Sequence, residues 1–228
     1  MPPLDEPFAD TRDMYMVHTM FRREFALLPA LVRGVTAGDE KRSQIVADHV
    51  AFLSTVMSSH HHSEDENLWP KLLDRSPAEV VPIIQSMQAH HASIERMNAE
   101  VTVATEAWRS SVASDSSEAL ASALDRLARE LNTHMSMEEQ LVLPIAGKYV
   151  TQAEWEEMAR GTGRGLPQEK GPLVFGMALY EGAPEVVEKT LSRLPPNVRS
   201  TMEELGPRVF ASYSELVHGT ATPPRSKS

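Results

Sequence analysis

One short pattern occurs twice in this sequence: a histidine, a glutamate four positions later, and a proline six positions after the glutamate. The two copies span residues 60–70 and 134–144. On an α-helix, residues four positions apart lie one above the other on the same face. Each copy therefore places an imidazole beside a carboxylate, and the repeat predicts two helices that each present such a pair. The four side chains are His60, Glu64, His134 and Glu138.

Apolar residues recur at helical spacing in four long segments before about residue 150. We expect helices over roughly 10–33, 39–69, 77–110 and 117–143, ended by Gly34, Pro70, a serine-rich stretch and Pro144. The connections between these segments are short. The sequence therefore predicts an all-α fold, an up-down-up-down four-helix bundle.

The pattern changes after residue 150. Residues 161–171 are rich in glycine and charge and indicate a loop, whereas 184–194 and 198–218 indicate further helices. The last residues, 220–228, have the composition of a disordered tail. We therefore divide the chain into a bundle domain, 1–150, and a C-terminal helical extension, 151–228, which packs on the bundle or on another subunit.

Composition excludes several kinds of site and partner. The formal net charge of −10 argues against a nucleic-acid partner or an anionic membrane surface. The absence of cysteine excludes disulfides, iron–sulfur clusters and thiolate metal sites. No apolar run is long enough to span a bilayer, and the N-terminus lacks the features of a secretory signal. We expect a cytoplasmic protein with no membrane partner, a monomer or a weak homodimer.

The other two helical segments each contribute one histidine, His18 and His91. Two His–Glu pairs and two single histidines, one group from each helix, form the ligand arrangement of a di-metal carboxylate site inside a bundle. Imidazole and carboxylate ligands suit iron or manganese, and zinc fits by ligand type. One such pair alone more often lies on a solvated face, but two matched copies favour a metal site. The predicted ligands are His18, His60, Glu64, His91, His134 and Glu138.

Three further histidines are expected to lie outside this site. His49 precedes His60 by eleven residues, about 16 Å along a helix, and we interpret it as an ordinary helix residue. His62 points away from Glu64 and should be exposed, and His218 has no partner visible in the sequence.

Together these motifs resemble the hemerythrin and HHE cation-binding family over about residues 10–149. The spacing of Met87, His91 and Ile94 follows the family's third-helix pattern and selects His91 over the adjacent His90. The resemblance implies a four-helix bundle that holds two iron ions, bridged by two carboxylates and by an oxo or hydroxo group.

The sequence departs from the oxygen-carrying members of that family. Those carriers have five histidine ligands, including a second histidine four residues after the one on the third helix, where this chain has Glu95. Their second bridging carboxylate is an Asp five residues after its histidine, whereas here it is Glu138, four residues after. The fifth ligand is therefore open. His61, about 60° from Glu64 around the helix, and Glu95 are the two candidates.

A site with fewer protein ligands is better suited to reacting with a small oxidant than to storing dioxygen. The first hypothesis is a catalase-like reaction with hydrogen peroxide, as a defence against oxidative stress. The second is a module that binds or senses dioxygen, nitric oxide or iron without turnover. The third is a site that only stabilises the bundle. Apolar residues around the histidines favour a small-molecule partner over a larger organic one.

Overall fold

The computed structural model describes residues 6–161 and 166–226. Within these ranges the regular structure is helical, and the single extended pairing is an isolated bridge between Phe8 and Thr151. The predicted all-α fold is confirmed. No helix in the described ranges is long and apolar enough to cross a membrane.

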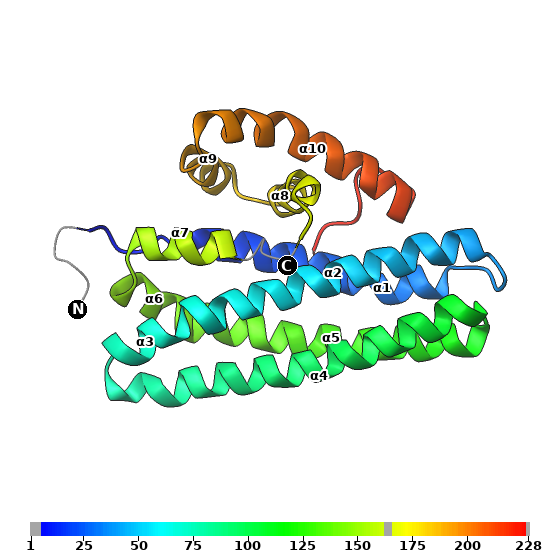
Figure 1. The fold of residues 1–228 in the computed structure, drawn as a ribbon, viewed down its shortest axis with the longest axis horizontal. Helices are drawn as coiled ribbons and strands as arrows, with labels where there is room; N and C mark the ends of the chain where they lie inside the picture. Colours follow the sequence, from blue (N-terminus) through cyan, green and yellow to red (C-terminus); the bar gives the residue numbers. More distant parts are fainter. Residues whose placement is uncertain (1–5, 162–165, 227–228) are drawn as a thin grey trace.

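Four long helices pack side by side with alternating direction and form the bundle (Figure 1). The helices are α1 (Arg12–Arg33), α2 (Glu40–Asn67), α4 (Val81–Ser111) and α5 (Ser114–Met137). A short helix, α3 (Trp69–Arg75), and a 3₁₀ turn, η1 (Ala78–Val80), lie between α2 and α4. The predicted up-down-up-down arrangement is therefore confirmed.

Both repeat prolines mark an interruption of a helix and also lie within the first turn of the next one. Pro70 is the second residue of α3, and Pro144 is the second residue of α6 (Leu143–Tyr149). Proline is tolerated there because the first N–H groups of a helix have no partner within the helix. Between α5 and α6 the chain forms a π-helical segment, η2 (Glu138–Val142), which begins at the predicted ligand Glu138. Such π segments often occur at functional sites.

The apolar stripes seen in the sequence form the core of the bundle. Phe21, Phe25, Leu53 and Leu127 are fully or almost fully buried between the helices. At the start of α2, the Asp39 carboxylate accepts a hydrogen bond from the backbone N–H three residues on, at 3.0 Å. This N-cap satisfies one of the free donors of the first turn.

The C-terminal extension is more helical than the sequence predicts. Two helices match the predicted ones, α9 (Pro184–Ser192) and α10 (Pro196–His218), but α7 (Gln152–Gly161), η3 (Gln168–Lys170) and α8 (Gly171–Leu179) were not predicted. Figure 1 shows α8, α9 and α10 as a layer on one side of the bundle, while α7 lies along α2. Part of the predicted loop over 161–171 is therefore helical, and 162–165 lie outside the described residues.

Two glycines allow α8 and α10 to pack closely. A Cβ atom on Gly176 of α8 would collide with the carbonyl oxygen of Gly206 of α10. The glycines of α8 weakened its helical signal in the sequence, but tertiary packing requires the close approach that they permit.

The tail also differs from the expected disorder. Between Thr220 and Ser226 the chain is irregular, but the backbone N–H of Ser226 donates to Glu181 Oε1 at 2.7 Å. The hydroxyl of Tyr180 donates to the Pro223 carbonyl at 3.0 Å. Residues 227–228 lie outside the described part.

Candidate metal centre

All six predicted ligands lie in the interior of the bundle, five from the four long helices and one from the π-helical segment η2. α1 contributes His18, α2 the first His–Glu pair, α4 His91 and α5 His134, and Glu138 is the first residue of η2. None of the six is more than 4 % exposed. A set of this charge and polarity is unusual in a helical core.

Each glutamate lies between two imidazoles from different helices. One oxygen of Glu64, Oε1, is 3.1 Å from His60 Nε2, and the other, Oε2, is 3.4 Å from His91 Nε2. Glu138 Oε2 is 3.3 Å from His18 Nε2 and 3.7 Å from His134 Nε2. Each carboxylate therefore faces the histidine of its own motif and a single histidine from another helix.

Of the two candidates for the fifth ligand, His61 is buried among the predicted ligands, whereas Glu95 is exposed. The His61 ring stacks on the His91 ring at a centroid distance of 4.2 Å and meets the His134 ring at 5.0 Å. Ligand atoms of these three histidines all lie within 4.8 Å of one another. Glu95 is exposed, and its Oε2 accepts a hydrogen bond from Ser58 Oγ at 2.8 Å.

Most of the polar atoms that face the centre have no hydrogen-bond partner. A buried polar atom without a partner costs about 1–3 kcal/mol, and a buried charge costs more. His91 Nε2 and His134 Nε2 face each other at 3.2 Å, close to the separation of roughly 3 Å between adjacent nitrogen ligands of one metal ion. Bound cations would satisfy this set. The unpartnered atoms include His18 Nε2, His60 Nε2, His61 Nδ1 and both oxygens of Glu64 and of Glu138.

Burial of the two glutamates also shifts their pKa values, and in opposite directions. Burial, together with the nearby charge of Glu138, raises the pKa of Glu64. Burial would also raise the pKa of Glu138, but the close approach and charge of the His18 imidazole outweigh it and lower that pKa. Two buried carboxylates that repel each other are both held in the charged form only when positive charge lies beside them. Cations between them would allow both to stay ionised.

Two acidic residues that the sequence interpretation missed contact the Nδ1 atoms of two predicted histidine ligands. Asp65 Oδ1 is 2.9 Å from His91 Nδ1, and Glu139 Oε1 is 2.9 Å from His18 Nδ1. Arg22 in turn donates to Glu139 at 2.6 Å. A carboxylate that accepts the Nδ1–H of an imidazole fixes the ring orientation and leaves Nε2 free for a metal. Both acids directly follow the glutamate of a repeat, so extending the repeat by one position would have found them.

Replacing Asp65 by alanine should weaken metal binding at this site about 10- to 100-fold, because His91 would lose the group that orients its ring. Glu66 provides the matched control, since it is the next residue of the same helix and pairs with the exposed His62 at the surface. Competition with a chelator measures the affinity of each variant. Equal affinities for Asp65→Ala and Glu66→Ala would show that the Asp65 contact does not support the site.

The remaining histidines divide into surface residues and a second cluster. The His62 side chain is 70 % exposed, as predicted. His90 turns toward Glu130 at the edge of the bundle. The interpretation of His49 as an ordinary helix residue is wrong in one respect, because it is fully buried beside the Glu24 carboxylate. His218, expected to have no partner, meets that carboxylate too, since tertiary packing brings the end of α10 there.

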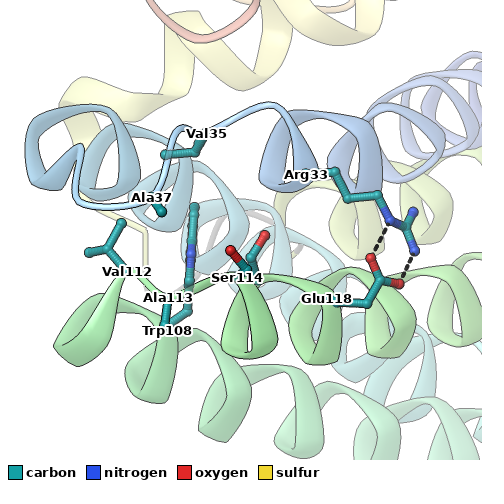
Figure 2. Close-up of a pocket in the computed structure, with 9 residues that line it drawn as sticks. Arg33, Val35, Ala37, Trp108, Val112, Ala113, Ser114 and Glu118 are labelled. Carbon is teal, nitrogen blue, oxygen red and sulfur yellow. Dashed lines mark hydrogen bonds and ion pairs between the residues drawn. The ribbon is translucent and has the colours of Figure 1, made fainter.

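Two open pockets reach the predicted ligands from different sides. A pocket of about 500 Å³ is bordered mostly by residues with polar side chains, among them His61, His91, Asp65 and Glu95. A mostly apolar pocket of about 400 Å³ lies between the bundle and the extension and reaches His60. A further pocket, drawn in Figure 2, lies at the other end of the bundle, where Arg33 and Glu118 form an ion pair, and contains none of these histidines.

A family model described as the hemerythrin HHE cation-binding domain matches residues 10–146. Searches of curated proteins and of solved structures gave no match. The match covers more than half of the chain and includes all the predicted ligands. It agrees with the family resemblance of the repeat and with the buried His–Glu set. This chain therefore belongs to the hemerythrin HHE cation-binding domain family.

Proposed function

We propose that the site holds two iron ions, one of which His18 and His60 would hold and the other His91 and His134. The observation that supports this proposal is the position of the two glutamates. Glu64 lies between His60 of the first pair and His91 of the second, and Glu138 lies between His18 and His134. Each carboxylate can therefore be shared by both ions, which is the arrangement of di-iron carboxylate proteins in helical bundles.

His61 is the proposed fifth nitrogen ligand, on the side of His91 and His134. Its ring centroid is 4.2 Å from that of His91 and 5.0 Å from that of His134, closer than the 5.6 Å that separates it from the ring of His60. The second ion would then have one more protein ligand than the first. An ion with fewer protein ligands keeps a position at which a small molecule can bind.

We further propose that the site disproportionates hydrogen peroxide. One peroxide is oxidised to dioxygen while another is reduced to two water molecules, so the reaction needs no external reductant. Two bound irons would supply the two-electron redox chemistry. The chain positions the imidazoles through Asp65 and Glu139 and surrounds the centre with apolar side chains. The pocket beside His61 and His91, whose bordering residues are mostly polar, gives a small molecule such as peroxide a route to the site.

Oxygen evolution from hydrogen peroxide tests this function. The assay compares the iron-loaded chain, the metal-free chain and the Glu138→Ala variant, with His62→Ala as a control at the surface. We expect evolution from the iron-loaded chain and from His62→Ala, and at least a 100-fold loss in the other two, roughly the effect of removing one essential charged group from a site. Evolution that persists without iron or without Glu138 would contradict the proposal.

The apolar pocket supports a second candidate function. It leads to His60, on the side of the ion with fewer protein ligands, and its lining includes Met14, Met16 and Trp155. An apolar route suits dioxygen or nitric oxide better than peroxide. If the iron-loaded chain evolves no oxygen and instead forms a reversible adduct with either gas, binding or sensing replaces catalysis as the function.

A further inference from the structure

A second cluster of buried ligand-type side chains lies outside the proposed di-iron centre. Glu24 of α1, His49 of α2 and His218, the last residue of α10, each contribute one ligand atom, and these atoms all lie within 4.8 Å of one another. Along α2, His49 is eleven residues from His60, about 16 Å, so the cluster is separate from the first site.

The distances within this cluster fit a metal ion. Glu24 Oε2 is 3.3 Å from His49 Nε2 and 3.3 Å from His218 Nε2. Two ligands at about 2.0–2.1 Å from a tetrahedral ion lie roughly 3.3 Å apart. Glu24 and His49 are fully buried, yet neither Glu24 Oε2 nor His49 Nε2 has a hydrogen-bond partner. Two unpartnered atoms therefore point at the same small volume.

The surrounding residues hold the three side chains in this arrangement. His49 Nδ1 is 3.0 Å from the Tyr213 hydroxyl, which fixes the ring and directs Nε2 toward Glu24. The other oxygen of Glu24 accepts a hydrogen bond from Arg23 Nε at 2.8 Å. Arg42 donates to the Leu216 and Val217 carbonyls, at the end of α10. Each ligand is thus positioned by a neighbour that does not occupy the central volume.

We propose that Glu24, His49 and His218 form a second, mononuclear site for a divalent transition-metal ion. Two imidazoles and one carboxylate are a ligand set suited to zinc and to iron(II). Because the ligands come from α1, α2 and α10, the ion links the C-terminal extension to the bundle. This site is independent of the proposed di-iron centre and of its reaction.

Metal content of zinc-loaded protein tests the site, with the His218→Ala variant as the main comparison. His218 ends its helix, so its removal leaves the core of the bundle intact. We expect wild type to hold one more ion per chain than His218→Ala, whatever the first site contains. His62→Ala removes an exposed histidine and should equal wild type. Equal numbers of bound ions per chain in wild type and His218→Ala would overturn the proposal. The three side chains would then interact only through hydrogen bonds.

A second variant and a measurement on wild type guard against misfolding. Glu24→Gln keeps the side-chain volume and should lose the same single ion. If either variant fails to fold, zinc is titrated into wild type whose first site is already filled with iron. We expect one further equivalent of zinc to bind. Its zinc-edge X-ray absorption spectrum should show two imidazole nitrogen ligands. The absence of this equivalent would overturn the proposal.

Discussion

The double variant Glu64→Ala, His134→Ala is expected to be purified without iron, whereas the wild-type chain should hold close to two irons in the first site. Glu64 lies between His60 and His91, and His134 faces both Glu138 and His91. The two substitutions remove a shared carboxylate and one imidazole, so each proposed ion loses at least one ligand. Iron content by elemental analysis and the near-ultraviolet and visible spectrum measure the loss.

His62→Ala is the control for this experiment, because it also removes a histidine from α2 but at an exposed position. It should retain the full iron content and spectrum. Full iron occupancy in the double variant would contradict the ligand assignment. A double variant that loses iron while its circular dichroism remains helical would separate metal binding from folding.

Removal of the metal should lower the melting temperature of the wild-type chain by roughly 6–20 °C. The metal-free centre leaves two carboxylates and several imidazoles buried together, and an unbalanced buried charge costs about 3–5 kcal/mol. For a chain of this size, each kcal/mol shifts the melting temperature by about 2–4 °C. An ion that binds only the native state adds stability by mass action.

Thermal unfolding with and without a chelator measures this difference. The His218→Ala variant is run in parallel, because it isolates the contribution of the first site from that of the proposed second one. The Glu64→Ala, His134→Ala variant, combined with His218→Ala, should melt at the same temperature in both conditions. An unchanged melting temperature for the metal-free wild type would mean that the centre does not contribute to the stability of the bundle.

The local sequence was most informative where helical periodicity and ligand spacing coincide. Spacing alone placed His60 beside Glu64 and His134 beside Glu138, because a helix fixes the relation of residues four apart. The same signal predicted the bundle, since long apolar stripes with short connections leave few other arrangements. It predicted α7 and α8 poorly, because short, glycine-containing helices depend on packing against neighbours.

The sequence by itself determined the helices of the bundle and the two His–Glu pairs, since these follow from interactions between residues a few positions apart. Only the tertiary structure placed the His61 ring against the His91 ring and paired the exposed Glu95 with Ser58. It also placed Asp65 and Glu139 beside rings from other helices. It also brought His218 to Glu24, almost two hundred residues away in the chain. Local spacing contains no information about which distant helix faces will meet, because that choice depends on the packing of the whole core.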